Sequence, residues 1–170
     1  MEVVSDTKMH LLEMQAHHYE AVKHIYELGI STQIATLETT APGWEEWDKN
    51  HLAAARIVAL DDDQVVGWAA LSPVSGRCVY GGVAEDSVYV HPEYAGKGVG
   101  VLLLTELVKR SEMAGIWTLQ AHMLSENIAS RKLHIKCGFR IVGIREGFGQ
   151  LHNKWRDTYL LERRSKVVGV

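Results

Sequence analysis

The sequence predicts an α/β fold in which helices flank a mixed sheet. Two patterns indicate this: two stretches with helical periodicity precede short β-branched runs, and the second half alternates strand-like and helix-like segments. The chain has 170 residues, of which 46% are hydrophobic and 23% charged. This is enough for one sizeable core and too short for two ordinary domains. We therefore expect one domain over residues 1–170, with residues 1–8 as a short N-terminal extension.

The first half is expected to contain two helices followed by a hairpin. Apolar side chains recur at helical spacing within residues 14–31, which predicts the first helix. Residues 32–42 are rich in threonine without that period, which indicates a loop or an extended segment. A second helix is expected at residues 43–55. Residues 56–74 form two β-branched runs around the acidic turn "DDDQ", a hairpin signal.

The second half continues with strands and two helices. Residues 77–82 leading into residues 83–92 predict a further strand pair. A glycine cluster then precedes a helix of about fifteen residues that ends near Gly115. The remaining expected elements are a strand at 116–123, a helix at 125–138, a strand at 139–148 and a last strand at 154–163. Strand and helix signals thus alternate to the end of the chain.

The composition restricts the partners and the compartment. A formal net charge of −3 and a pI near 6.3 give no general attraction to nucleic acid or to an anionic membrane. No secretory signal pattern opens the chain, and no apolar run approaches the roughly 18 residues that a membrane span needs. Cys78 and Cys137 lack metal-ligand spacing, and the nine histidines form no ligand pattern. We expect a cytoplasmic protein with no metal, nucleic-acid or membrane partner.

The stretch "HPEYAGKGVG" at residues 91–100 is the sharpest local signal. A Walker A loop needs Ser or Thr after the lysine, but Lys97 is followed by Gly98. A dinucleotide fingerprint starting at Gly96 needs glycine where Val101 stands and an acid near Gln120. Two interpretations remain: backbone N–H groups at a helix start that face an anion, or a simple turn joining a strand to a helix.

The surrounding segments resemble the Gcn5-related N-acetyltransferase (GNAT) superfamily. "EDSVYVHPEYAGKGVG" and, about thirty residues later, "NIASRKLHIKCGF" carry this resemblance. "STQIATLETTAPGWEEW", "LSPVSGR" and "KWRDTYLLE" are similar to the phosphinothricin and methionine sulfoximine N-acetyltransferase group, so the resemblance covers residues 10–162. It implies a GNAT-type, mostly antiparallel central sheet flanked by helices, with a splayed strand pair holding acetyl-CoA. It also implies a single N-acetyltransferase domain and a homodimer.

The resemblance implies two catalytic residues. Glu85 matches the family glutamate assigned as general base, directly or through water, and partial burial would raise its pKa toward a useful range. Strand periodicity places Glu85 on one face with Tyr89, and Asp86, a weaker candidate, on the other. His134 stands where the subgroup carries a histidine that protonates the departing thiolate. A solvated acid and a core histidine are the structural alternatives for Glu85 and His134.

The same resemblance assigns the cofactor and acceptor sites. Main-chain groups of Val88, Tyr89 and Val90 would bind the pantetheine arm, and Asn127 would contact it or cap a helix. Ala95 departs from the family's Gln or Arg, so we expect weakened cofactor binding. The pyrophosphate would be held by Gly96, Lys97, Gly98, Val99, Gly100 and Val101. The acceptor residues would be Thr36, Arg77, Tyr80, Glu85, Asp86 and Ser87, with Glu38, Trp155 and Asp157 as further walls.

The implied reaction is acetylation, by direct transfer from acetyl-CoA, of the amine of a small amino-acid analogue of the phosphinothricin or methionine sulfoximine type, and the implied role is detoxification. Arg77 suits the carboxylate of such an acceptor. Gly81 replaces a second arginine of the subgroup, which weakens the case for phosphinothricin itself. The alternatives are another amine (a polyamine, an aminoglycoside or a protein N-terminus) and a non-catalytic acyl-CoA-binding module.

Overall fold

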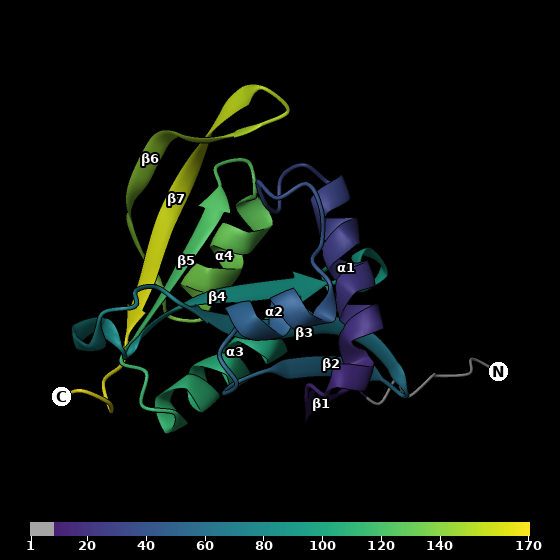
Figure 1. Ribbon diagram of the computed structural model, residues 1–170, viewed down its shortest axis with the longest axis horizontal. Helices are drawn as coiled ribbons and strands as arrows, with labels where there is room; N and C mark the ends of the chain where they lie inside the picture. Colours follow the sequence, from purple (N-terminus) through teal and green to yellow (C-terminus); the bar gives the residue numbers. More distant parts are fainter. Residues whose placement is uncertain (1–8) are drawn as a thin grey trace.

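One sheet organises the part of the chain that the structure, a computed structural model, describes, residues 9–170 (Figure 1). Its strands are β1 (Met9–Glu13), β2 (Ile57–Asp61), β3 (Gln64–Pro73), β4 (Val83–Val90), β5 (Thr118–Leu124), β6 (Arg140–Leu151) and β7 (Lys154–Arg164). Their order is β1-β2-β3-β4-β5-β7-β6, and every neighbouring pair is antiparallel except β4 and β5. The mixed, mostly antiparallel sheet is confirmed. The expected extension at residues 1–8 lies outside the described residues.

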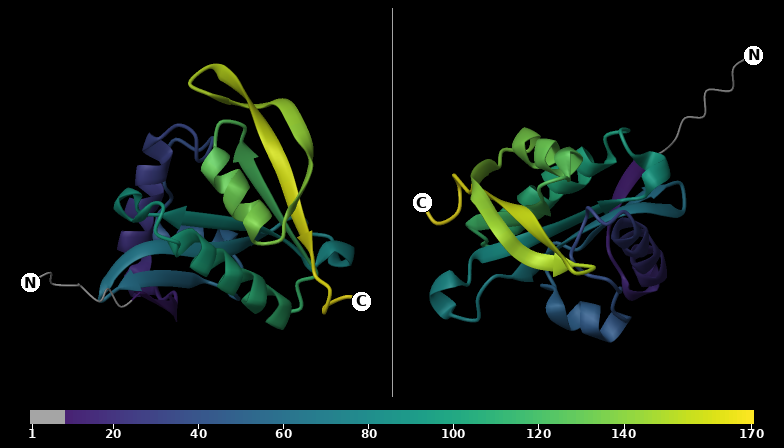
Figure 2. Two further views of the ribbon diagram at one scale, coloured as in Figure 1. Left: turned by 180° about the vertical axis from the view of Figure 1, so that it is seen from behind. Right: turned by 90° about the horizontal axis from the view of Figure 1, so that it is seen from above.

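Helices cover both faces of the sheet. In Figure 2, α1 (Tyr19–Ser31) and α2 (Trp44–Asn50) lie on one face, and α3 (Val99–Met113) and α4 (Ile128–Lys136) lie on the other. Beneath α3, the buried Leu103, Leu104 and Leu107 pack on the sheet. Beneath α1 and α2, buried aromatic and aliphatic side chains, Trp47 and Trp68 among them, form a second cluster. Burying a large aromatic or leucine side chain contributes roughly 1.5–3 kcal/mol, so the two layers fix the sheet between them.

The parallel pair opens into a splay. β4 pairs with β5 through Val83, Ala84 and Glu85 only, although both strands continue beyond these residues. Figure 1 shows the two arrows diverging from this point, with α3 between them in the chain. Parallel neighbours need such a crossover, because a tight turn reverses the direction of the chain. The expected splayed strand pair is therefore present.

Three expectations differ from the structure. No element was expected at residues 9–13, where the structure has β1, an edge strand that pairs with β2. The expected strand at residues 77–82 is instead a short 3₁₀ helix, Cys78–Tyr80, because Tyr80 and Gly81 donate their N–H groups to carbonyls three residues back. α2 ends at Asn50 rather than near residue 55, because His51 turns into extended backbone. Within residues 9–170, no helix is both long and apolar enough to cross a membrane.

Candidate active site

The open edge of β4 presents main-chain groups to the splay. His91 donates its N–H to the Val66 carbonyl, and hydrogen-bonded pairs alternate along an antiparallel ladder. The register therefore directs the N–H and C=O groups of Tyr89 toward β3. Those of Val88 and Val90 face the other way, into the splay beyond the last β5 pair. Of the three residues expected to bind the pantetheine arm with their main chain, two present main-chain groups on that side.

The glycine loop leads into α3 with the backbone geometry that glycine permits. Gly96 and Gly98 have φ of +74° and +82°, and Gly98 is the N-cap of α3. An added Cβ at either position would meet no atom of the described residues within 4 Å, so the loop leaves room above the helix N-terminus. The Lys97 side chain is exposed, and its ammonium lies 5.0 Å from the centre of the Tyr94 ring.

A cavity of about 1110 Å³ runs through the splay and past this loop. Its wall includes many of the residues expected to bind acetyl-CoA or the acceptor: Thr36, Glu38, Glu85, Asp86, Ser87, Val88, Tyr89, Val90, Gly96, Gly98, Val99, Gly100, Val101, Asn127 and His134. Lys97, Arg77 and Tyr80 are not part of the wall. The glycine-rich stretch at residues 91–100 and the later segment that contains Asn127 and His134 therefore line the same cavity.

Glu85 lies where β4 and β5 separate, in contact with two β5 side chains. Its Oε1 accepts a hydrogen bond from the Gln120 amide at 3.2 Å and a very short one from His122 Nδ1. Burial would raise the pKa of Glu85, but the hydrogen bond and charge of His122, the Gln120 amide and the charge of Arg145 outweigh it. The pKa of Glu85 therefore lies below its ordinary value. The expectation that partial burial raises the pKa of Glu85 was wrong. The sequence does not reveal that β5 places two hydrogen-bond donors beside this carboxylate.

His122, one of the histidines that form no ligand pattern in the sequence, is a wall residue of the cavity. Its ring stacks on Phe148 with the centres 5.8 Å apart. Nε2 is buried and has no hydrogen-bond partner among residues 9–170. Strand alternation in "TLQAHML" places Gln120 and His122 on one face, which was a usable signal. The parallel register that brings this face beside Glu85 was not readable from the sequence.

Asp86 and His134 form a buried ion pair on the opposite face of β4. His134 Nε2 lies 2.9 Å from Asp86 Oδ1, and the two side chains are 4% and 2% exposed. Nδ1 lies 2.8 Å from the Ser130 carbonyl, which can only accept. Burial would lower the pKa of His134, but the charge and hydrogen bond of Asp86, with the Ser130 carbonyl, raise it above its ordinary value. Both ring nitrogens of His134 therefore lie beside protein oxygens that accept hydrogen bonds, an arrangement that favours the charged ring.

Two further expected residues lie on the cavity wall and also hold local structure. Asn127 is the N-cap of α4, and its side chain accepts the Ser130 N–H at 3.2 Å. The Thr36 hydroxyl accepts the Glu38 N–H at 3.1 Å. Both side chains therefore contribute a polar group to the cavity from a rigid position.

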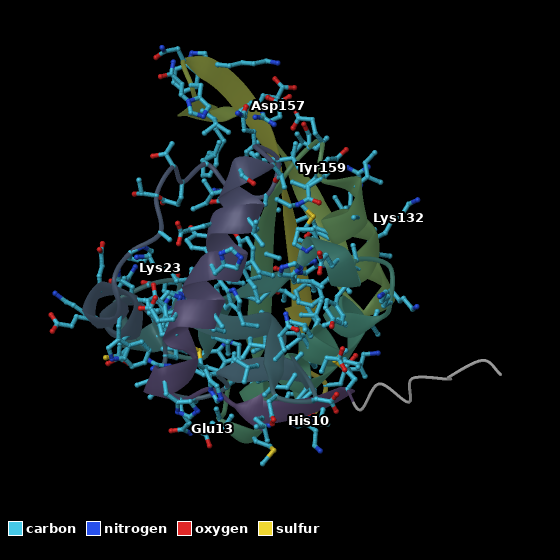
Figure 3. The ribbon with its side chains drawn as sticks, turned by 90° about the vertical axis from the view of Figure 1, so that its right-hand side faces the viewer. His10, Glu13, Lys23, Lys132, Asp157 and Tyr159 are labelled. Carbon is cyan, nitrogen blue, oxygen red and sulfur yellow. The ribbon has the colours of Figure 1, made fainter. Side chains whose placement is uncertain are left out.

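The remaining expected acceptor residues lie outside the cavity wall. The Arg77 guanidinium lies 5.6 Å from the centre of the Tyr80 ring, on the 3₁₀ segment before β4. Trp155 is 63% exposed. Asp157 lies high on β7 in the projecting hairpin, above Tyr159 (Figure 3), and accepts the Gly147 N–H at 2.8 Å. In this chain these side chains do not meet Glu85.

Two buried polar residues on β7 were not expected from the sequence. Arg156 and Thr158 are buried, and the Nε of Arg156 and the Oγ1 of Thr158 have no partner among the described residues. Arg156 also donates to the Gln33 carbonyl and pairs with Glu126. Thr158 shares a sheet face with His122 and belongs to the cavity wall. In the sequence, only the two-residue period of the strand "KWRDTYLLE" indicated that Arg156 and Thr158 share one face.

The fold and the cavity define a class of protein. An unpaired strand edge, a glycine loop at a helix N-terminus and room between two diverging strands fit an extended thioester carrier with a phosphate group. Main-chain donors suit such a carrier, and Val88, Val90 and the loop from Gly96 to Val101 have main-chain groups on this side. This is the architecture of an acyl-CoA-dependent transferase.

The comparisons with known proteins agree. The sequence profile of the Acetyltransferase (GNAT) family matches residues 19–139. The chain is 31% identical over 150 residues to the Alcaligenes faecalis phosphinothricin N-acetyltransferase, covering 84% of this chain and 76% of that protein. It is 35% identical over 102 residues to the Pseudomonas aeruginosa L-methionine sulfoximine/L-methionine sulfone acetyltransferase, covering 58% of each. The chain therefore belongs to the GNAT family and is an acetyl-CoA-dependent N-acetyltransferase.

A solved structure supports the same assignment. The Sinorhizobium meliloti GNAT superfamily phosphinothricin acetyltransferase, determined in complex with acetyl-CoA, superimposes with a TM-score of 0.85 at 30% identity. The match covers 95% of this chain and 90% of the other. The expected GNAT-type fold is confirmed.

Proposed function

We propose that the protein acetylates the amine of a small amino-acid analogue of the methionine sulfoximine or phosphinothricin type. The observation that carries this proposal is the Glu85 carboxylate, which lies on the cavity wall where β4 and β5 separate. The names of the two relatives support the substrate class. A detoxifying role in the cytoplasm follows from that substrate class.

The chain's own residues account for each part of the transfer. Acetyl-CoA supplies the activated acetyl thioester. Val88 and Val90 hold the carrier along β4, and the Val88 N–H donates to the thioester oxygen as negative charge develops there. The ammonium of the acceptor loses a proton to the hydrogen-bonded pair of Glu85 and His122, and the free amine attacks the thioester carbon. The C–S bond breaks, the thiolate leaves, and the amine nitrogen loses a second proton to become an amide.

His134 faces the leaving group in this scheme. As a cation it stabilises the departing thiolate, and its Nε2 proton, shared with Asp86, passes to sulfur. One proton is released to water per turnover, since the ammonium and the amide nitrogen give up two and the thiolate takes one. Asn127 and the loop at residues 96–101 hold the rest of the carrier.

The acceptor side is formed by the residues on the α1 face. Thr36 and Ser87 offer hydroxyl groups to a polar acceptor. Arg145 is exposed and outside the cavity wall, but it is close enough to Glu85 to lower the pKa of that carboxyl, and a turn of its side chain would bring it to the acceptor's carboxylate. Arg77 serves this purpose only if its loop moves toward the cavity or another subunit brings it there.

A homodimer is also proposed. Large apolar side chains are exposed along β6 and β7: Ile141, Val142, Ile144, Phe148 and Trp155. Exposed apolar side chains on a projecting hairpin are typical of an interaction surface. Sedimentation velocity would show a mass near twice 19.0 kDa if the hairpin joins two copies.

A thiol-release assay tests the proposed function. Purified protein and acetyl-CoA are mixed with methionine sulfoximine, methionine sulfone, phosphinothricin, spermidine or an aminoglycoside. Release with the amino-acid analogues alone supports the proposal, whereas release with the cationic amines alone keeps the chemistry and refutes the substrate class. Because the exposed Cys78 also reacts with a thiol dye, the Cys78→Ser variant provides the background.

A further inference from the structure

His122 carries an unused lone pair inside the cavity. The Glu85 carboxylate can only accept, so the proton of their hydrogen bond belongs to His122 Nδ1. In the neutral ring, Nε2 is then unprotonated. It is buried and has no hydrogen-bond partner within residues 9–170. A buried nitrogen of this kind is rarely left unpaired, so a group that enters the cavity is its natural donor.

Glu85 is less well placed to take the proton itself. Its Oε1 already accepts from both His122 and Gln120. These donors and the charge of Arg145 lower the pKa of the carboxyl group, which makes both oxygens of Glu85 weak acceptors for a further proton near neutral pH. A carboxylate that holds one nitrogen of an imidazole orients the ring and stabilises the imidazolium once it forms.

We propose that His122 is the proton acceptor for the incoming amine and that Glu85 is its positioning carboxylate, which rests on the proposed function. The lone pair of Nε2 takes a proton from the acceptor's ammonium. The N–H bond of the ammonium breaks, a new N–H bond forms on Nε2, and the positive charge moves to the imidazolium beside Glu85. The neutral amine then attacks the thioester, and the imidazolium returns its proton to water.

The groups around the ring fit this role. Glu85 faces it from β4, Gln120 neighbours it on β5, and Phe148 of β6 covers the ring face. Arg145 is the other charge that acts on Glu85, and Glu38 is a further acidic residue of the cavity wall. The ring is held between Glu85 and Phe148, which gives Nε2 a fixed direction.

Turnover of matched variants tests the proposal. His122→Gln keeps a side chain that can hydrogen-bond to Glu85 but cannot take a proton, and we expect kcat to fall by about 10²–10⁴-fold. Glu85→Gln keeps an oxygen for Nδ1–H and loses only the charge, so we expect a loss nearer 10-fold. His17→Gln, an exposed histidine away from the cavity, is the control and should match the wild type. The pH profile of kcat/KM should lose its ascending limb in His122→Gln.

The result that overturns the proposal is His122→Gln turnover within about threefold of wild type alongside a much larger loss in Glu85→Gln. An independent measurement does not need an acceptor: the ¹⁵N spectrum of the His122 ring in the wild-type protein. Protonated Nδ1 and bare Nε2 at pH 7.5 support the assignment, and a protonated Nε2 refutes it. Failure of the amine panel would refute the proposed substrate class, whereas the ring spectrum would still decide the state of His122.

Discussion

Replacing Asp86 by Asn removes one charge from the buried pair with His134 and nearly preserves its shape. Leaving an unpaired buried charge costs about 3–5 kcal/mol, but His134 can lose its proton and accept a hydrogen bond from the new amide. The expected loss is therefore nearer the roughly 1.5–3 kcal/mol of a charge-assisted hydrogen bond. For a chain of 170 residues this corresponds to a fall in Tm of roughly 3–12 °C.

The pH dependence of the unfolding free energy distinguishes the loss of this ion pair from a loss of packing. The folded-state pKa of His134 is raised above 6.5, so its contribution is fully present below pH 6.5 and is lost as pH rises through the folded pKa. The difference in unfolding free energy between wild type and Asp86→Asn should therefore be largest near pH 6 and small near pH 9. Urea unfolding followed by the fluorescence of the buried Trp47 and Trp68 measures it.

The control is Asp63→Asn in the exposed hairpin turn, which should change the unfolding free energy by less than about 0.5 kcal/mol at either pH. A difference between wild type and Asp86→Asn that is equal at pH 6 and pH 9, or larger at pH 9, would refute the charged state of His134.

Two further predictions concern glycine and cysteine. Gly82→Ala should lower the unfolding free energy by about 2–3 kcal/mol, because its Cβ would lie 1.9 Å from the Trp117 ring, whereas Gly76→Ala, with open space around it, should be neutral in the same urea titration. A thiol dye at pH 8 should label the exposed Cys78 quickly and Cys137 slowly, because burial raises the pKa of the Cys137 thiol; equal rates, measured by peptide mass, would contradict this.

The sequence predicted those elements whose signals are local. The hairpin of β2 and β3 follows from an acidic turn between β-branched runs, and α3 from glycines before an apolar helical stretch. β1 was missed because a five-residue edge strand has a partner on one side only, and its apolar and polar residues form no clear alternation. The segment at 77–82 was assigned to a strand because its sequence does not reveal the two hydrogen bonds that close the 3₁₀ turn.

For the site, the sequence predicted only which side chains share one face of a strand. Alternation along β4 gave the opposite faces of Glu85 and Asp86. The partners of these carboxylates are 37 and 48 residues away in sequence, on β5 and α4. Those contacts depend on the parallel register of β4 and β5 and on how α4 packs, which one sequence does not specify.

In the proposed mechanism, the two adjacent carboxylates divide the proton transfers between the two faces of the sheet. Glu85 holds His122 by Nδ1 and leaves Nε2 free, which suits a group that takes a proton. Asp86 holds His134 by Nε2 while the Ser130 carbonyl takes Nδ1–H, which suits a ring that is charged before it gives a proton to the thiolate. In this proposal, an amine arriving on the α1 face meets a ring with an open nitrogen, and a thiolate leaving on the α4 face meets a ring with both nitrogens hydrogen-bonded. The consequence is testable in one variant set: if the two pairs act separately, the losses in kcat from His122→Gln and Asp86→Asn should multiply in the double variant.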